Sequence, residues 1–507
     1  MKRKSWILIG FIFLKFILQY HLISPEYNLQ RDEYLYLDQA HHLAWGYLSV
    51  PPVSSWISTI IYFLGNSVFW VKFFPALFGA LTIFIVWKTI EELKGNLFAL
   101  ILGATGVLFS ALLRLNTLYQ PNSLDVLCWS FLYFVIVKYF NTENTKWLFA
   151  AALIFAFGFL NKYNIVFLII GLVPAILFTD QRKIFLKKEL YLAILLGMVV
   201  IFPNLLWQYN NDFPVVHHLG ELAKTQLVHV GRIGFLKSQL FFFIGSILPI
   251  ICAIYALLLY KPYQKYKPFF GVFFFTLIVF MYFRAKDYYA IGLYPIYISF
   301  GSVFLADFLK NGWKQYLRPI VLAIPILFFI PIYQIAFPNK SPDYIVQNAN
   351  AYKKYGLLRW EDGKDHSLPQ DYADMLGWEE LARKVDSVYI KLPNADQTLV
   401  LCDNYGQAGA INYYTKQHIK AVSFNADYVN WFNLDRQYIN LIRIKDHAKK
   451  DNELIETSPY FNLAYVADSI TNPYAREFKT LIFAFIGAKV DVNKRIKNEI
   501  EETKNYR

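Results

Sequence analysis

The sequence predicts a helical, multi-pass membrane protein that carries an α/β domain outside the membrane at its C-terminal end. Hydrophobic residues make up 56% of the 507 residues and aromatic residues 19%, whereas only 17% are charged. Apolar runs of membrane length follow one another up to residue 337, and the segment 338–507 is more polar. Because a soluble protein could not bury so much apolar surface, residues 1–337 are expected to form a transmembrane domain.

The apolar runs give about eleven candidate spans, since a helix needs ~20 apolar residues to cross the hydrocarbon layer. They are expected at residues 5–23, 67–88, 96–114, 122–140, 147–161, 163–179, 189–208, 238–260, 268–284, 288–308 and 318–337. The stretch 147–179 could also form one long kinked segment. Residues 5–23 lack a small-residue cleavage site and are long for the apolar region of a signal peptide, so they are expected to remain as the first span.

The Lys and Arg residues indicate how these spans are oriented. With the N-terminus in the cytoplasm, every inner loop carries cations, beginning with Lys2-Arg3-Lys4, whereas the outer loops carry far fewer. This orientation places the first outer loop, residues 24–66, and the segment 338–507 on the outer face. The net charge of +13 does not indicate nucleic-acid binding, because the cations form short clusters between apolar runs.

The segment 338–507 has apolar runs of strand length and is expected to fold as an α/β domain. Residues 398–402 predict a buried strand, followed by a turn at Asp403-Asn404 and a helix from Gln407 to about Thr415. Residues 421–424 and 481–485 predict two further strands. The basic tail beyond Lys494 predicts a solvated helix.

Polar residues that could perform chemistry gather at the outer face. Asp32 and Glu33 follow the first span by a few residues, where ionised groups are costly and are usually retained for a task. Other outer-face groups lie at span ends or in the first outer loop: Pro51, Pro52, Asn122, Asp125, Lys162, Arg284, Lys286, Tyr288 and Tyr289. Together they offer carboxylates, cations and aromatic side chains at one surface of the membrane.

These groups match what sugar transfer from a lipid phosphate requires. Arg and Lys bind phosphate through short charge-assisted hydrogen bonds and stabilise the charge that develops on a phosphate leaving group. At the other end, an acceptor hydroxyl must lose a proton, which a carboxylate can accept. A single displacement at the anomeric carbon would invert its configuration.

Each group also has a purely structural interpretation. An Asp-Glu pair in a loop is often only solvated, and Arg284 and Lys286 could extend from span ends toward the interface. Tyr288 and Tyr289 could belong to the interfacial aromatic belt. Asp125 and Lys162 fit this interpretation less well, since opposite charges near span ends on one face favour pairing inside the bundle.

Several short motifs, in this order and spacing, resemble glycosyltransferase family 39. They are Arg31-Asp32-Glu33-Tyr34, Trp45-Gly46-Tyr47, Pro51-Pro52, Pro121-Asn122-Ser123-Leu124-Asp125, Gly158-Phe159-Leu160-Asn161-Lys162-Tyr163, Pro203-Asn204-Leu205-Leu206-Trp207-Gln208, Lys286-Asp287-Tyr288-Tyr289 and Tyr294-Pro295. That family comprises protein O-mannosyltransferase-like enzymes and bacterial lipid A aminoarabinose transferases. The resemblance covers residues 1–337, and residues 404–410 are similar to the C-terminal domain of bacterial members. It implies the membrane fold called GT-C.

The resemblance also implies a polyprenyl-phosphate-linked sugar donor, used at the periplasmic face of a bacterial inner membrane. It implies that Asp32 and Glu33 are the catalytic carboxylates, with Asp32 preferred, and that Lys286 binds the donor phosphate with support from Arg284 and Lys162. The aminoarabinose transferases have Lys-Pro-Pro where this sequence has Val50-Pro51-Pro52, so one phosphate-binding lysine of that group is absent. A lipid, a glycan or a protein remains open as the acceptor, and so does Mg²⁺ or Mn²⁺ beside the carboxylates.

Two other functions compete with glycosyl transfer. A transporter or flippase for a lipid-linked sugar would have similar spans, but such proteins usually show repeats and polar groups near the midplane, whereas the polar groups here gather at one face. The chain could also be an inactive family member that serves as an assembly subunit.

Overall fold

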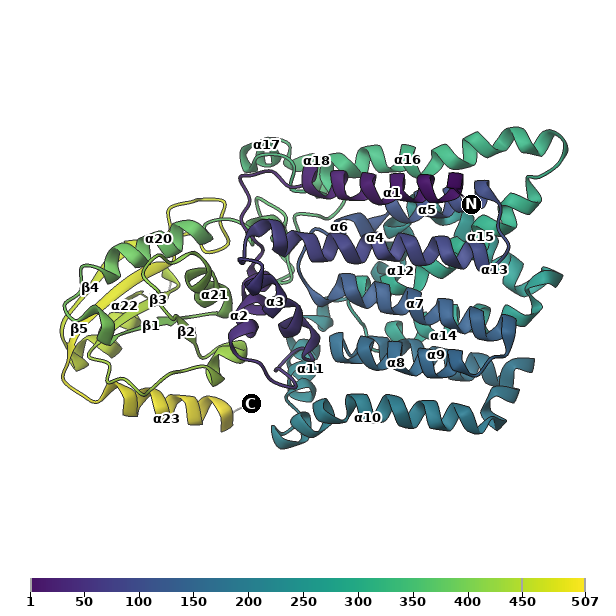
Figure 1. The fold of residues 1–507 in the computed structure, drawn as a ribbon. Helices are drawn as coiled ribbons and strands as arrows, with labels where there is room; N and C mark the ends of the chain where they lie inside the picture. Colours follow the sequence, from purple (N-terminus) through teal and green to yellow (C-terminus); the bar gives the residue numbers. More distant parts are fainter. Residues whose placement is uncertain (1, 448–449, 506–507) are drawn as a thin grey trace.

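The computed structural model describes residues 2–447 and 450–505, which form a long helical bundle with an α/β unit at one end (Figure 1). The described N-terminal residues lie at the opposite end of the bundle from the α/β unit, and the short helices α2 and α3 lie between the two parts. The first outer loop predicted from the sequence therefore lies where bundle and α/β unit meet.

The bundle is built from long apolar helices. They are α1 (Lys2–His21), α4 (Val68–Glu92), α5 (Leu97–Leu108), α7 (Pro121–Thr142), α8 (Lys146–Asn161), α9 (Ile165–Leu177), α10 (Lys188–Asn210), α12 (Arg232–Phe242), α13 (Ile247–Leu259), α14 (Pro268–Tyr282), α15 (Tyr294–Phe308) and α16 (Arg318–Ile335).

Among the described residues, five helical segments are long and apolar enough to cross a membrane on their own. They are Val68–Glu92, Pro121–Thr142, Lys188–Asn210, Asp287–Phe308 and Gly312–Ile335. Two pairs of helices bent at a short break raise the number to seven if each pair forms one span. The predicted number of about eleven spans is therefore not confirmed, although helices occupy all of the predicted regions. In the stretch 147–179, two separate helices, α8 and α9, flank Lys162.

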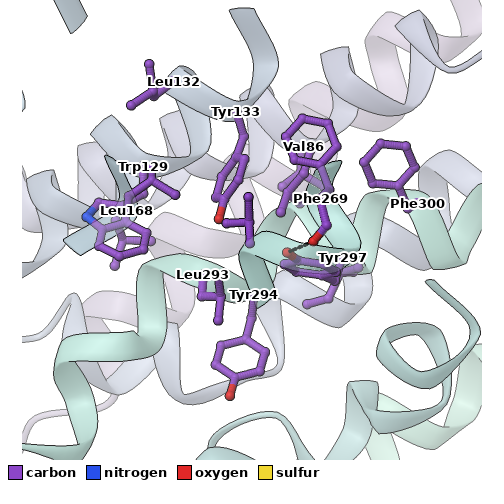
Figure 2. Packing of buried hydrophobic residues seen from close by; sticks show 14 of the residues in the cluster. Val86, Trp129, Leu132, Tyr133, Leu168, Phe269, Leu293, Tyr294, Tyr297 and Phe300 are labelled. Carbon is purple, nitrogen blue, oxygen red and sulfur yellow. Dashed lines mark hydrogen bonds between the residues drawn. The ribbon is translucent and has the colours of Figure 1, made fainter. Parts of the chain in front are cut away.

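The centre of the bundle is packed with aromatic side chains. Trp129 and Tyr133 of α7 face residues from α14 and α15 (Figure 2). The Tyr297 hydroxyl donates a hydrogen bond of 2.6 Å to the Phe269 carbonyl oxygen, so this buried polar group has a partner. The interior is thus a filled core, and the polar groups considered below lie at its end.

Short helices connect and cover the parts. They are α2 (Arg31–Asp38), α3 (Val53–Phe63), α6 (Ala111–Leu115), α11 (Pro214–Thr225), α17 (Pro342–Gln347), α18 (Ala349–Lys353), α19 (Gln370–Ala373) and α20 (Trp378–Tyr389). The connection from α16 to α20 runs along the end of the bundle and carries Glu361, Asp371 and Asp374, which contact bundle or loop residues.

The α/β unit contains a five-stranded sheet with the order β2-β1-β3-β5-β4. Its strands are β1 (Thr398–Cys402), β2 (Val422–Ser423), β3 (Asn440–Lys445), β4 (Phe461–Ser469) and β5 (Leu481–Ala488), and its later helices are α21 (Tyr405–Tyr414), α22 (Lys450–Thr457) and α23 (Val492–Asn505). Strand β1 is parallel to β2 and β3, whereas β5 is antiparallel to β3 and β4. Alternate residues of β1 belong to different cores: Val400 and Cys402 pack with α20 and α21, and Leu399 and Leu401 pack with α23.

The strands predicted at 398–402, 421–424 and 481–485 correspond to β1, β2 and β5, and the predicted tail helix corresponds to α23. Strands β3 and β4 were not predicted. Strand β4 lies at an edge of the sheet, and most of its residues are only partly buried or exposed, so it lacks the continuous apolar run that marks β1.

Candidate active site

The first turn of α2 is fixed by a reciprocal cap. The Gln30 side chain accepts a hydrogen bond from the Asp32 backbone N–H, and the Glu33 carboxylate accepts one from the Gln30 N–H at 2.6 Å. This capping box uses an acid three residues after the cap, where it also interacts favourably with the helix dipole. The cap defines the directions in which the Asp32 and Glu33 side chains leave the helix.

Glu33 points into the protein and is completely buried. Besides the Gln30 N–H, its oxygens accept two hydrogen bonds of 2.7 Å from the Lys72 ammonium group of α4 and one of 2.6 Å from the Tyr119 N–H. Such a fully paired carboxylate joins α2 to the bundle and has no open side for a substrate. These contacts give Glu33 the surroundings of a structural anchor, and its role as a second catalytic carboxylate stays a prediction.

Asp32 points the other way, and its side chain is 31% exposed. The Tyr405 hydroxyl of α21 donates to its Oδ1 at 2.6 Å, and the Gln120 side chain donates to its Oδ2 at 3.2 Å. The Arg31 Nε atom lies 3.7 Å from Oδ1. Since a carboxylate has about four lone-pair positions, these contacts leave Asp32 able to accept a further proton.

A chain of hydrogen bonds connects Asp32 to Lys162. Gln120, which bonds to Asp32, accepts a hydrogen bond of 2.9 Å from the Asn122 side chain. Asn122 in turn accepts one of 2.7 Å from the Lys162 ammonium group. Pro121 begins α7 between the two amide residues, at the first helical position that proline favours. The start of α7 thus places Asn122 between the carboxylate and the cation.

The Lys162 ammonium group lies over the rings of the two tyrosines that precede α15. Its ammonium nitrogen is 4.2 Å from the centroid of the Tyr289 ring and 5.4 Å from that of Tyr288. In the same helix as Asn122, Asp125 accepts hydrogen bonds from Asn164 and Trp129, and Asn164 also donates to the Tyr289 carbonyl oxygen. These bonds join α7, α9 and the segment before α15, so the predicted groups Asn122, Asp125, Lys162, Tyr288 and Tyr289 do come together.

Lys286 bonds to a residue that sequence reasoning did not identify. Its ammonium group donates a hydrogen bond of 2.8 Å to Glu361, which lies in the connection between α16 and α20. Burial acts to lower the pKa of Lys286, but the charge and hydrogen bond of Glu361, with contributions from Tyr289 and Asp32, outweigh it and raise that pKa above its usual value. Lys286 is therefore a stable cation within electrostatic reach of Asp32.

Arg284, Pro51 and Pro52 have other positions. Arg284 is exposed, has a positive φ of 51° and lines an open hollow together with Arg232 and Tyr282. This hollow is not lined by Lys286 or Asp32, so the structure does not group Arg284 with them. Pro51 and Pro52 are buried at the start of α3, where the Ser55 hydroxyl bonds to the Pro52 carbonyl oxygen, and they shape the loop around the site.

The two carboxylates do not fit a shared divalent ion. All donors around Glu33 are N–H groups, and its oxygens are enclosed. In the part of the chain that the structure describes, no group of three or more His, Cys, Asp or Glu side chains could hold a metal. Asp32 and Glu33 thus lack the clustered oxygen ligands that Mg²⁺ or Mn²⁺ requires.

Sequence reasoning missed Lys72, Gln120, Tyr405 and Glu361. The spacing of Gln30 and Glu33 could have indicated a cap, and a lysine near the start of a predicted span could have indicated a buried partner for Glu33. Tyr405 directly follows the predicted turn at the carboxyl end of a buried strand, where functional side chains often lie in α/β sheets. No local pattern distinguishes Glu361.

Comparisons with known proteins are consistent with this architecture. Residues 49–207 match the model of the family described as dolichyl-phosphate-mannose-protein mannosyltransferase. A stretch of 198 residues, 38% of this chain, is 25% identical to the lipid A galacturonosyltransferase RgtD of Rhizobium johnstonii and spans 41% of that protein's length.

Two solved structures of ArnT from Cupriavidus metallidurans share the fold. The structure bound to undecaprenyl phosphate has a TM-score of 0.63 at 13% identity and covers 95% of this chain and 98% of its own. The apo structure has a TM-score of 0.61 at 12% identity, covering 96% and 98%. These structures show that the chain has the fold of the ArnT proteins, and the sequence matches agree with the predicted resemblance to glycosyltransferases of this fold.

Proposed function

We propose that the protein transfers a sugar from a polyprenyl-phosphate donor to a hydroxyl or phosphate acceptor, with inversion, at the periplasmic face of a bacterial inner membrane. The observation that carries the proposal is the position of Asp32. This partly exposed carboxylate lies at the end of an apolar bundle, joined by hydrogen bonds to Lys162 and within electrostatic reach of Lys286.

Lys286 and Lys162 are assigned to the donor phosphate. Lys162 lies in the break between α8 and α9, and Lys286 bonds to Glu361 in the connection between α16 and α20. Such positions outside the long helices suit the head group of a lipid donor. The two cations can stabilise the charge that grows on the phosphate as the sugar leaves. Tyr288 and Tyr289 hold Lys162 through their ring faces and border the phosphate position.

Asp32 is assigned to the acceptor. Its carboxylate accepts the proton of the acceptor's O–H group as the acceptor oxygen forms a bond to the anomeric carbon. The bond between that carbon and the phosphate oxygen breaks at the same time, and its electron pair leaves with the lipid phosphate. Attack opposite the leaving group inverts the anomeric configuration. No step needs an acid at the phosphate, because a phosphate leaves readily as an anion.

The names of the similar proteins favour particular classes of donor and acceptor. One ArnT structure is bound to undecaprenyl phosphate, which favours a lipid of that class as the donor's carrier. RgtD is named as a lipid A galacturonosyltransferase, which favours a lipid or glycan acceptor over a protein. Because RgtD is named as a transferase, the alternative of a lipid-linked sugar flippase is not favoured.

Mass spectrometry of lipids and surface glycans from a gene-deletion strain tests the proposal. We expect one sugar to be missing from a lipid or glycan, with the matching polyprenyl-phosphate sugar accumulating. Wild-type protein should restore the modification, whereas Asp32→Asn should not. Full restoration by Asp32→Asn would remove Asp32 from its role, and unchanged glycans in the deletion strain would contradict the transfer itself.

The orientation is tested separately with reporter fusions. Fusions within residues 24–66 and after residue 338 should report a periplasmic position, and a fusion at the N-terminus should report a cytoplasmic one. A cytoplasmic position of the 24–66 loop would contradict the proposed site of the reaction.

A further inference from the structure

We propose that Tyr405 is a positioning residue for Asp32, so that the α/β unit completes an active site which the membrane bundle does not form by itself. This inference rests on the role of Asp32 in the proposed function. It assigns a task to a residue of the C-terminal part of the chain, to which the sequence analysis assigned no site residue.

Tyr405 is held in place by the start of α21. It is the first residue of this helix and follows β1 after the turn at Asp403-Asn404. The Asn404 side chain caps the helix by accepting a hydrogen bond of 3.1 Å from the Gln407 N–H, and Glu477 accepts hydrogen bonds from the Asn404 and Gln407 side chains. The backbone that carries Tyr405 is therefore fixed from two sides.

Close packing of α21 on α2 brings the tyrosine to the carboxylate. A Cβ atom at Gly406 would overlap the Arg31 side chain, and one at Gly409 would lie only 2.7 Å from the Tyr34 Cβ. The two glycines thus allow the helices to approach more closely than larger residues would. The Arg31 guanidinium lies over the Tyr405 ring at 4.8 Å, which holds the ring from the other side.

The hydrogen bond from Tyr405 controls the carboxylate in two ways. It orients Oδ1, while Gln120 orients Oδ2, so the plane of the carboxylate is fixed by one group from each part of the protein. It also stabilises the ionised form that accepts the acceptor's proton. Burial, followed by the charge of Asp32, raises the pKa of the Tyr405 hydroxyl well above its usual value, so Tyr405 keeps its proton throughout.

Other tyrosines of the interface serve docking instead. Tyr413, also in α21, donates a hydrogen bond of 2.8 Å to the Asn66 carbonyl oxygen, and Tyr428 donates to Asp38 at 2.5 Å. These bonds hold the α/β unit on the bundle without contacting Asp32. Tyr413→Phe is therefore a matched control for Tyr405→Phe, because each removes one hydroxyl from the same helix and keeps its ring.

The kinetic test uses full-length protein in lipid nanodiscs. Polyprenyl-phosphate sugars and the unmodified acceptor fraction are both extracted from the deletion strain, and release of polyprenyl phosphate is followed. For Tyr405→Phe we expect kcat to fall by about tenfold or more, because small displacements of a catalytic group have large effects on rate. The amount of donor needed for half-saturation should stay within about twofold, and Tyr413→Phe should behave as wild type.

The pH dependence separates positioning from general stabilisation. If Tyr405 acts through Asp32, the rate–pH profile of Tyr405→Phe should differ from that of wild type, whereas the profile of Tyr413→Phe should match it. The other titratable and charged groups around Asp32 are unchanged in this variant. They are the cations Arg31 and Lys286, the carboxylate of Asp374, and the hydroxyls of Tyr36 and Tyr288. Wild-type turnover with an unmoved profile in Tyr405→Phe would overturn the inference.

Infrared difference spectroscopy gives a result that does not depend on turnover. The carboxylate band of Asp32 is identified by subtracting the spectrum of Asp32→Asn, and it should shift in Tyr405→Phe but not in Tyr413→Phe. An unshifted band would refute the hydrogen bond in the working protein. If the band shifts but Asp32→Asn transfers sugar normally, the assignment of Asp32 as the proton acceptor fails, while its positioning by Tyr405 stands.

Discussion

Asp32 and Glu33 are adjacent in the chain, but their side chains enter two different regions of the molecule. Glu33 enters the bundle, where Lys72 and two backbone N–H groups use its oxygens completely. Asp32 enters the interface with the α/β unit, where two weaker constraints leave it partly exposed. The comparison shows that a pair of acidic residues can combine one structural anchor with one chemically available carboxylate, because successive residues of a helix point in different directions.

The largest effect is expected from breaking the Glu33 anchor. Glu33→Gln leaves the Lys72 cation buried without a counter-charge, which typically costs about 3–5 kcal/mol. We expect little folded protein in size-exclusion chromatography of detergent extracts. The double variant Glu33→Gln with Lys72→Met removes the unpaired charge and should recover part of the yield. A well-folded but inactive Glu33→Gln protein would instead indicate a direct chemical role and break the comparison.

Asp32→Asn should have the opposite profile. Because Asp32 lies at an interface and is partly exposed, its replacement by an isosteric amide should leave the folded yield near that of wild type. Loss of the proton acceptor should lower the transfer rate by about 10²-fold or more. The assay is the polyprenyl phosphate release described above, with thermal unfolding as the control. A rate within a few-fold of wild type would show that Asp32 is not the proton acceptor and would remove the proposed difference between Asp32 and Glu33.

Glu361→Gln should strengthen donor binding by a smaller factor. The Glu361 carboxylate forms an ion pair with the Lys286 ammonium group. A donor phosphate that binds Lys286 must therefore either displace this carboxylate or lie beside its negative charge. With the charge removed, we expect undecaprenyl phosphate to bind about three- to tenfold more tightly, measured by native mass spectrometry or microscale thermophoresis. Lys353→Gln, which breaks the exposed pair with Asp365 in the same connection, is the control. Weaker binding in Glu361→Gln would indicate that Glu361 supports the donor site.

The smallest expected effect concerns Asp38 at the other end of α2. Burial raises its pKa from 3.8 to about 6, opposed by hydrogen bonds from Tyr428 and Asn412. The folded state therefore binds this proton more tightly than the unfolded state does. The resulting stabilisation is complete at pH values below the pKa of Asp38 in the unfolded chain, and it is lost as the pH rises through about 6.

Asp38→Asn should remove this pH-dependent contribution. Between pH 5 and 7.5, the melting temperature of wild type should fall more than that of Asp38→Asn, by a difference on the order of 2 °C. Burial also raises the pKa of Asp374 to about 6. Its contribution to the pH dependence of the melting temperature is the same in both proteins, so it cancels when they are compared. Equal changes in the two proteins would show that Asp38 does not titrate in this range.

Much of the architecture could be predicted from local patterns. Apolar runs located the helices of the bundle, and the continuous apolar residues 399–402 located β1, because burial on both faces of a strand removes most polar residues from it. The number of spans could not be derived in this way. Breaks such as the one between α12 and α13, bent by 69°, depend on packing against neighbours and not on hydropathy.

The site was predictable only in part, for a related reason. Asp125, Lys162 and Tyr289 belong to motifs whose polarity at span ends is visible in the sequence, and they do meet. The different roles of Asp32 and Glu33 depend on Lys72 and Tyr405, which are 39 and 373 residues away from the carboxylates they contact. Such distant pairings leave no periodic or local signal.

The most direct test of the account is a structure of the full-length protein with undecaprenyl phosphate in lipid nanodiscs, determined by cryo-electron microscopy. We expect the lipid's phosphate within hydrogen-bond distance of the Lys286 ammonium group, with Glu361 displaced from it and Asp32 still bonded to Tyr405 on the same side of the membrane. A phosphate bound elsewhere, with the Lys286–Glu361 pair intact, would contradict the proposed active site.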